Sequence, residues 1–383
     1  MEIYLDNSAT TKPYKEVVEK MVHALEEEYA NPSSLHRKGV EVEKSIKKIR
    51  QDIAKTIGAK DKEIYFTSGG TESNNTIIRS VANLHKKRKN HIISTEIEHP
   101  SVLNTLKDLE EDGFEVTYLK VDGFGKISIE DLKNAITDKT SLVTVMHVNN
   151  EVGTIQPIQE IGKYLKSLSD KVYFHVDAIQ SYTKINFRPS RYNIDFMSVS
   201  GHKFHGPKGI GFMYIKENNR IKPMFTGGGQ EIGIRSGTEN VPGIYGLGEA
   251  CKIATNKLDE KIEKINRLKN LLKEEISNNI EDIKINSVED GVCHILNISF
   301  KDIRGEILLH YLEQRDMYVS TGSACSSKKK GSHVLNAMNL SKDEIEGAIR
   351  FSLSDLNTEE EIINAVKILK ESVEDLRIII KRR

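Results

Sequence analysis

The chain has 383 residues and carries 56 lysines and arginines against 56 aspartates and glutamates, so its formal net charge is zero. Such a balance provides no overall attraction to nucleic acid or to an anionic membrane. Apolar residues make up 38% of the chain and charged residues 29%, which indicates a globular protein with a large core, not a disordered chain. The length fits two or three domains.

Neither a signal sequence nor a membrane span is apparent. The chain begins MEIYLDNSATT, without the basic start and apolar run of a secretory signal. No apolar run reaches the roughly 18 residues that a spanning helix needs. We therefore expect a soluble, cytoplasmic protein. The three cysteines, Cys251, Cys293 and Cys325, are too few and too dispersed for a disulfide framework or a zinc site.

Short apolar runs alternate with longer helical patterns between residues 64 and 215. Six runs predict buried strands, at residues 64–67, 91–94, 116–119, 142–146, 172–176 and 196–199. Most of the segments between them are long enough for crossover helices. The alternation predicts an α/β architecture with a mostly parallel sheet flanked by helices.

The pattern changes after Gly243. A helical stretch runs to Asn279, and a strand (295–299) and an amphipathic segment (306–315) follow. The capping-box patterns at 341–344 and 358–361 predict two helix starts. One apolar stripe follows the second start at steps of three and four, through Ile362, Val366, Leu369, Val373, Leu376 and Ile380. We expect a smaller α+β domain of residues 1–14 and 246–383 beside a large domain of residues 15–245.

The segment 198–211 carries the first candidate for chemistry, Lys203. It follows a strand, in a glycine-rich turn that also holds Ser200 and His202. A lysine in this position is suited to a Schiff base with an aldehyde cofactor, because burial lowers the pKa of the amine. The alternatives are a surface lysine, a weak nucleotide-binding pattern in the glycines, or a metal site formed by His202 and His205.

Asp177 lies just past the strand 172–176, where ligands of α/β proteins bind. A carboxylate there would keep the pyridine nitrogen of pyridoxal 5′-phosphate (PLP) protonated, so that the ring accepts electrons. The alternative is an N-cap for a following helix. The glycine turn 67–73 has the character of a phosphate site at a helix N-terminus, and it lacks the lysine of a Walker loop.

Polar residues collect at several other strand exits. His99 and Asn150 each follow a predicted strand, and Thr71 lies in the glycine turn. His99 would stack on an aromatic ring or move a proton, although a lone histidine is often only structural. Together with Asp177 and Lys203, these residues predict one site.

Motifs along almost the whole chain resemble those of cysteine desulfurases of the NifS/IscS type, in the aminotransferase class V group of fold-type I PLP enzymes. The similar segments lie at 4–11, 31–36, 70–72, 147–151, 176–180, 200–209, 235–240 and 323–326. The resemblance implies the fold of the PLP-dependent transferases of fold type I. It also implies PLP as cofactor and a homodimer.

The resemblance assigns roles to single residues. Lys203 would hold PLP as a Schiff base, Asp177 would pair with the ring nitrogen, and His99 would stack on the ring. Gln180 would bind the phenolic oxygen, and Asn150 and Arg350 would grip the substrate carboxylate. The phosphate would be held by Gly70, Thr71, Ser200 and His202, and by Thr238 of the second subunit.

Cys325 is the residue that the resemblance makes a sulfur carrier. It lies in a run of small and polar residues followed by Lys328–Lys330, which favours the thiolate form. Lys203 would act as a base on the substrate Cα, and the Cys325 thiolate would then attack the sulfur of L-cysteine. The products would be alanine and a Cys325 persulfide. For an isolated loop cysteine, the alternative is an inert thiol; Cys251 and Cys293 are expected to be structural.

The persulfide would pass to a protein acceptor, such as an iron–sulfur scaffold or a thiolation enzyme. Direct binding of nucleic acid or membrane is not expected. Two other functions stay open: another fold-type I PLP enzyme, such as a selenocysteine lyase or an aminotransferase, and a non-catalytic sulfur-relay subunit.

Overall fold

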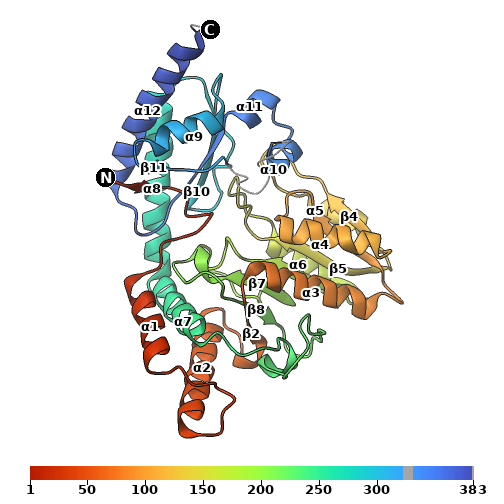
Figure 1. Cartoon of the computed structure of the whole chain (residues 1–383). Helices are drawn as coiled ribbons and strands as arrows, with labels where there is room; N and C mark the ends of the chain where they lie inside the picture. Colours follow the sequence, from red (N-terminus) through yellow and green to blue (C-terminus); the bar gives the residue numbers. More distant parts are fainter. Residues whose placement is uncertain (322–330, 382–383) are drawn as a thin grey trace.

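A seven-stranded sheet forms the largest element of the computed structural model, which describes residues 1–321 and 331–381 (Figure 1). The strand order is β2-β8-β7-β6-β5-β3-β4. The strands are β2 (Ile64–Thr67), β3 (His91–Thr95), β4 (Glu115–Leu119), β5 (Thr140–Met146), β6 (Tyr173–Asp177), β7 (Phe196–Ser200) and β8 (Gly211–Ile215). β8 runs antiparallel to both of its neighbours, and the other pairs are parallel. This confirms the mostly parallel sheet.

Helices cover both faces of this sheet, which explains its apolar strands. Ile77 and Leu106 pack on one face, and Ile53 and Leu247 belong to the core on the other. Residues of β7 alternate between the faces, with Phe196 in the first core and Met197 in the second. The helices in this part of the chain are α1 (Lys15–Glu26), α2 (Arg37–Thr56), α3 (Gly70–His85), α4 (Pro100–Glu111), α5 (Ile129–Ala135), α6 (Ile158–Ser167) and α7 (Val241–Thr255).

The C-terminal part has its own antiparallel sheet, in the order β12-β10-β9. Helices α8 and α12 lie side by side next to it (Figure 1). Its elements are α8 (Leu258–Asn279), β9 (Ile283–Ile285), β10 (Ile295–Phe300), α9 (Gly305–Glu313), β11 (Met317–Tyr318), α10 (His333–Ala337), α11 (Lys342–Glu346), β12 (Ala348–Ser352) and α12 (Glu359–Lys381). The helical stretch expected up to Asn279 is two helices, because Lys257 adopts a left-handed conformation (φ 52°) between α7 and α8.

Both capping boxes are confirmed. Ser341 and Glu344 exchange side-chain and backbone hydrogen bonds at the start of α11. Thr358 and Glu361 do the same at the start of α12, at 3.0 and 3.2 Å. From Ile362 to Leu376, the expected apolar stripe of α12 is buried in the core of the C-terminal part.

The N-terminal segment crosses from the C-terminal part to the large sheet. β1 (Ile3–Tyr4) pairs in parallel with β11, and Asn7 Nδ2 donates to the carbonyl of Ser352 at 2.9 Å. The carbonyl of Ser8 then accepts a hydrogen bond from Lys203, in the 3-10 turn η2 (Gly201–Lys203) that follows β7. The described residues also form the 3-10 turns η1 (Asp61–Glu63) and η3 (Glu231–Gly233). Within residues 1–321 and 331–381, no helix has the length and apolar character needed to cross a membrane.

Candidate active site

The candidate site lies at the carboxyl ends of two neighbouring parallel strands. β6 ends at Asp177 and β7 at Ser200, with Asp177 opposite Ser198 in the register. Lys203 follows in the η2 turn. Parallel strands that end at one sheet edge bring their terminal side chains together, which is where α/β proteins bind ligands.

Lys203 is held by the N-terminal segment. Its Nζ donates to the carbonyl oxygens of Ser8 at 2.6 Å and Ala9 at 2.8 Å. Gln180 Nε2 donates to the same Ser8 carbonyl at 3.0 Å. The backbone of Ser8 therefore brings Lys203 and Gln180 to one place.

Asp177 is 5% exposed, and two uncharged N–H groups donate hydrogen bonds to its carboxylate. Its Oδ2 accepts from Asn74 Nδ2 at 2.8 Å, and its Oδ1 accepts from the backbone N–H of Ile179 at 3.0 Å. Burial raises the pKa of the Asp177 carboxyl, against the opposing effects of these hydrogen bonds and the charges of His99 and Lys203. A turn, not a helix, follows β6, so the N-cap alternative for Asp177 is wrong.

His99 combines a structural position with a place in the site. It is the N-cap of α4, and its Nδ1 accepts from the backbone N–H of Ser101 at 3.1 Å. Burial lowers the pKa of His99, with the charge of Asp177 acting against this and that of Lys203 adding to it. Hydrogen bonds through Ser101 and Asn74 connect His99 to Asp177.

The glycine turn before α3 leads directly to Ser200. A Cβ on Gly69 would lie 3.3 Å from Ser200 Oγ, and one on Gly70 would lie 2.0 Å from Ile179 Cδ1, so a side chain at Gly70 would displace the end of Ile179. Thr71 is exposed in the first turn of α3. The N-terminus of α3 and the hydroxyl of Ser200 thus share one corner of the sheet edge, where exposed N–H groups attract an anion.

His202 faces the N-terminal segment, with Nδ1 3.2 Å from Thr10 Oγ1. Burial lowers its pKa to about 4, and the charges of Lys203 and Lys208 contribute. His202 is therefore neutral at pH 7 and offers an N–H donor without adding charge.

Arg350, in β12, is 3% exposed and faces the same region from the C-terminal sheet. Its Nη1 donates to the carbonyl of Asn150 at 2.9 Å, and its Nη2 donates to Asp6 Oδ1 at 2.7 Å. Its buried Nε finds no hydrogen-bond partner among the described residues. One edge of this guanidinium therefore still has donor capacity.

His294 was missed by the sequence reading. It is 2% exposed, and its Nε2 lies 3.2 Å from Gln180 Oε1. Burial lowers its pKa well below the usual range, and the charges of Lys184, Lys269, Arg350 and Lys203 act in the same direction. A single histidine before a strand carries no pattern that would have marked it in the sequence.

Thr238 is not joined to the other site residues among the described parts of the chain. Thr238 is exposed in the segment between η3 and α7, and its role from a second subunit stays a prediction. Cys325 lies outside the described residues.

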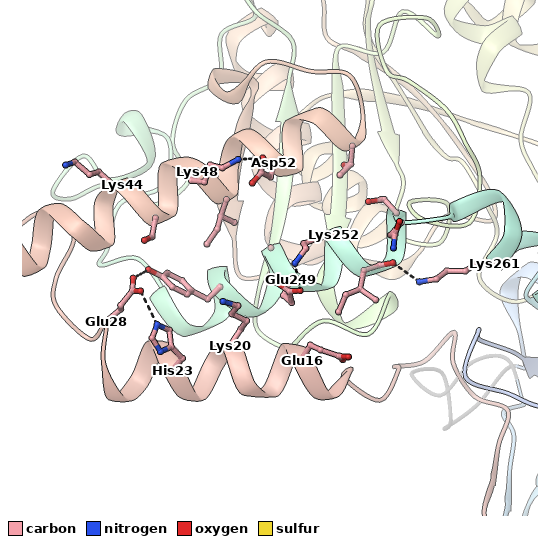
Figure 2. Close-up of a pocket in the computed structure, with 18 residues that line it drawn as sticks. Glu16, Lys20, His23, Glu28, Lys44, Lys48, Asp52, Glu249, Lys252 and Lys261 are labelled. Carbon is pink, nitrogen blue, oxygen red and sulfur yellow. Dashed lines mark hydrogen bonds and ion pairs between the residues drawn. The ribbon is translucent and has the colours of Figure 1, made fainter.

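A large hollow lies away from this site. It lies between α1, α2 and α7, with a volume of about 1150 Å³ (Figure 2). Several of its charges pair with each other, such as Lys48 with Asp52 at 2.7 Å and Lys252 with Glu249 at 2.9 Å. None of the described site residues lines it. Size alone therefore does not identify the site.

Comparison with known proteins agrees with this geometry. Residues 3–364 match the family model described as aminotransferase class-V. A cysteine desulfurase IscS from Dictyoglomus turgidum is 43% identical over 380 residues, covering 99% of this chain and 96% of the relative. One from Methanosarcina thermophila is 43% identical over 377 residues, covering 98% of this chain and 93% of the relative.

Solved structures are similar over the same length. A structure titled NifS-like protein superimposes with a TM-score of 0.92 at 40% identity, covering 97% of this chain and 99% of that chain. One titled SspA in complex with cysteine has a TM-score of 0.82 at 37% identity, covering 93% of this chain and 100% of that chain. The chain belongs to the aminotransferase class V family and, within it, to the cysteine desulfurases.

Proposed function

We propose that this protein is a PLP-dependent cysteine desulfurase of the cytoplasm, which converts L-cysteine to L-alanine and delivers the sulfur to a protein acceptor. The observation that carries the proposal is the meeting of Lys203 and the buried Asp177 at adjoining strand ends. This arrangement occurs in a chain whose full length matches cysteine desulfurases. Enzymes of this family depend on PLP in general.

The described residues fit PLP. Asp177 is a buried carboxylate with uncharged N–H groups at hydrogen-bond distance, and a protonated ring nitrogen would add a cation in direct contact with it. Lys203 offers an amine for the Schiff base. Gly70, Thr71, Ser200 and His202 would hold the phosphate, with His99 on the ring and Gln180 and Asn150 at its substituents. When bound, PLP supplies an electron sink for the carbanion at the substrate Cα.

The remaining steps fall to side chains of this chain. The guanidinium of Arg350 and the amide of Asn150 would bind the substrate carboxylate, for which the unpartnered Nε of Arg350 provides a donor. Lys203 would remove the Cα proton as the general base, with His99 placed to handle a second proton.

Cys325 would receive the sulfur. Its thiolate forms a bond with the substrate sulfur while the Cβ–S bond of cysteine breaks. The electron pair of the broken bond stays on the carbon, which takes up a proton, and alanine leaves. The sulfur remains on Cys325 as a persulfide for transfer to an acceptor, such as an iron–sulfur scaffold or a thiolation enzyme.

The protein would act as a homodimer in which Thr238 reaches the phosphate of the other subunit. Exposed apolar side chains support a partner surface: Leu35 is 98% exposed and Ile232 68%, and Val18, Val22 and Leu25 are exposed on α1. Ile232 lies six residues from Thr238 in the chain. A surface covered by a second copy would remove these side chains from water.

The decisive experiment compares Cys325→Ala with Cys251→Ala. Cys251 is a buried free thiol, and burial raises its pKa to about 12, which makes it unreactive. We expect Cys325→Ala to keep bound PLP but to lose sulfide release from L-cysteine, whereas Cys251→Ala keeps both. Unchanged sulfide release by Cys325→Ala would contradict the proposed role of this thiol.

The same preparation tests the alternatives. A yellow protein whose PLP absorbance changes with L-cysteine excludes the non-catalytic relay. Alanine formation that exceeds 2-oxo-acid-dependent amino transfer excludes an aminotransferase, and parallel assays with L-selenocysteine measure the preference between the two substrates.

A further inference from the structure

Asn74, in α3, bridges two parts of the candidate site. Its side chain is fully buried, and its Nδ2 lies 2.8 Å from Asp177 Oδ2 and 2.9 Å from Ser101 Oγ. Its Oδ1 has no hydrogen-bond partner among the described residues. Rotating the amide by half a turn would aim Oδ1 at the Asp177 carboxylate. The amide therefore donates to both partners, at the cost of one unpaired oxygen.

Hydrogen bonds of Ser101 extend this network from Asn74 to His99. The backbone N–H of Ser101 donates to His99 Nδ1 at 3.1 Å, so this nitrogen is an acceptor. The Ser101 hydroxyl accepts from Asn74 and lies 2.8 Å from the same Nδ1. Its own proton therefore goes to Nδ1, and the neutral His99 ring carries its proton on Nε2.

We propose that Asn74 is a positioning residue, which couples the Asp177 carboxylate to the His99 ring through the Ser101 hydroxyl. Asp177 and His99 are two of the groups assigned above to the ring of PLP, so the inference rests on the proposed function for the identity of the ligand. One neutral amide would then orient the carboxylate and, through the Ser101 hydroxyl, reinforce the imidazole tautomer that the backbone N–H of Ser101 also favours. Residues joined in one hydrogen-bond network have effects that do not add.

A double-mutant cycle on PLP binding tests the coupling. The dissociation constant is measured by titrating PLP-free protein with PLP and following absorbance. We expect Asn74→Ala to raise it about tenfold and Ser101→Ala about threefold, the scale of single buried hydrogen bonds. In the double variant the dissociation constant should also rise only about tenfold, because removing Asn74 already removes the donor on which the contribution of Ser101 depends. The matched control is Asn83→Ala, an exposed asparagine on the same helix that donates only to the carbonyl of Arg79.

A dissociation constant raised about thirtyfold in the double variant, the product of the two single effects, would overturn the coupling. An equal dissociation constant in Asn74→Ala and Asn83→Ala would overturn it as well. If Asn74→Ala fails to fold, Asn74→Asp replaces it: a carboxylate cannot donate to Asp177, and a wild-type dissociation constant would overturn the inference. A wild-type protein that binds no PLP would instead contradict the proposed function.

A second measurement needs no PLP. In protein labelled with ¹⁵N-histidine, nitrogen resonances distinguish protonated from unprotonated ring nitrogens, and the His99 signals are assigned by their loss in His99→Gln. We expect Nδ1 of neutral His99 to be unprotonated in the wild type and in Asn83→Ala. A protonated Nδ1 with an unprotonated Nε2 would contradict the network, whatever ligand the site binds.

Discussion

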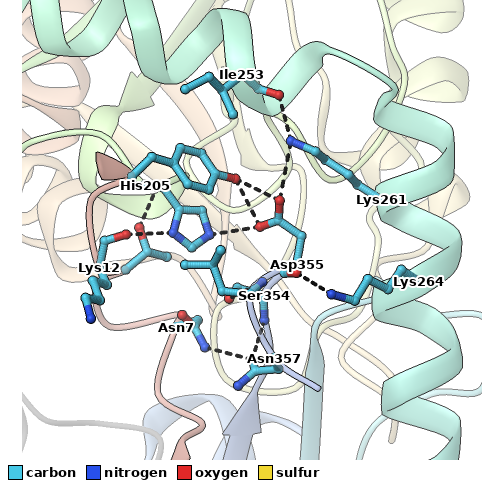
Figure 3. Close-up of polar contacts among 12 residues, drawn as sticks. Asn7, Lys12, His205, Ile253, Lys261, Lys264, Ser354, Asp355 and Asn357 are labelled. Carbon is cyan, nitrogen blue, oxygen red and sulfur yellow. Dashed lines mark hydrogen bonds and ion pairs between the residues drawn. The ribbon is translucent and has the colours of Figure 1, made fainter. Parts of the chain in front are cut away.

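Two aspartates, Asp177 and Asp355, differ in their surroundings: Asp177 is buried and Asp355 is partly buried. Asp177 ends a strand of the large sheet, and uncharged N–H groups are its hydrogen-bond donors. Asp355 follows the C-terminal sheet and is surrounded by potential cations (Figure 3). Its Oδ1 lies 3.2 Å from His205 Nε2, and its Oδ2 lies 3.3 Å from Lys261 Nζ. The hydroxyl of Tyr14 donates to both oxygens, at 3.0 and 2.9 Å.

The pKa values of the two carboxyl groups are shifted in opposite directions. Burial raises the pKa of both, but at Asp355 the hydrogen bond and charge of His205 and the charges of Lys184 and Lys261 outweigh it and lower the pKa well below the usual range. At Asp177 burial prevails. The difference teaches that a carboxylate whose hydrogen bonds and neighbouring charges outweigh the cost of burial stabilises the fold, whereas one at which the cost of burial prevails marks a ligand site.

The largest expected effect is that of Asp177→Asn on catalysis. Without the charge, the pyridine nitrogen of PLP loses its counterion, and kcat/KM for alanine formation should fall on the order of a thousandfold. Alanine release from L-cysteine measures it. The control is Asp355→Asn, which should stay within about threefold of the wild type. Equal losses in the two variants would break the distinction between them.

For the stability of the protein, we expect the larger loss in Asp355→Asn. Asp355→Asn leaves His205 and Lys261 without their carboxylate, and the free energy of unfolding should fall by about 3 kcal/mol. Urea unfolding of PLP-free protein, monitored by circular dichroism, measures this. Asp177→Asn should not destabilise the PLP-free protein. A loss below about 0.5 kcal/mol for Asp355→Asn would show that the ion pairs contribute nothing net.

The smallest effect is a difference in pH dependence. The pKa of Asp355 is lowered in the folded protein, so its contribution is fully present above the ordinary pKa and is lost as the pH falls below about 4. The pKa of Asp177 is raised, so its charge costs stability at neutral pH, and protonation relieves this cost as the pH falls.

Unfolding of PLP-free protein at pH 8 and pH 5 distinguishes the pH dependence of the Asp355 contribution to stability from that of Asp177. The Asp355 carboxyl stays ionised at both pH values, so its own titration should not change the stability gap between wild type and Asp355→Asn. Asp177→Asn should be more stable than the wild type at pH 8, and this advantage should shrink at pH 5. An advantage that grows at pH 5 would contradict the raised pKa.

Sequence periodicity predicted the strands of the large sheet, but not the breaks and turns between elements. All six strands predicted for the large sheet are present, because apolar runs between helical segments have few other arrangements. The break at Lys257 was not predicted, since a left-handed lysine depends on tertiary packing and not on local propensity. The antiparallel direction of β8 likewise depends on the short connection from β7, which periodicity does not reveal.

The site residues that follow strands could be predicted from the sequence. The residues that form hydrogen bonds with them could not. Asp177, Ser200 and Lys203 stand at strand ends, which the sequence locates. Asn74 and His294 lie within or beside ordinary elements, and only the folded chain brings them to Asp177 and Gln180. The metal site considered for His202 and His205 is not formed, because these rings face Thr10 and Asp355 respectively.

The crossing of the N-terminal segment has a consequence for the order of folding during synthesis. Ser8, whose carbonyl binds Lys203, is fixed by Ser352 Oγ, which binds its backbone N–H at 2.8 Å. These two residues are 344 positions apart in the chain. The ribosome therefore releases almost the whole polypeptide before the first residues can settle around the lysine. A nascent or truncated chain would hold the large sheet without a finished active site, which delays cofactor capture until synthesis is complete.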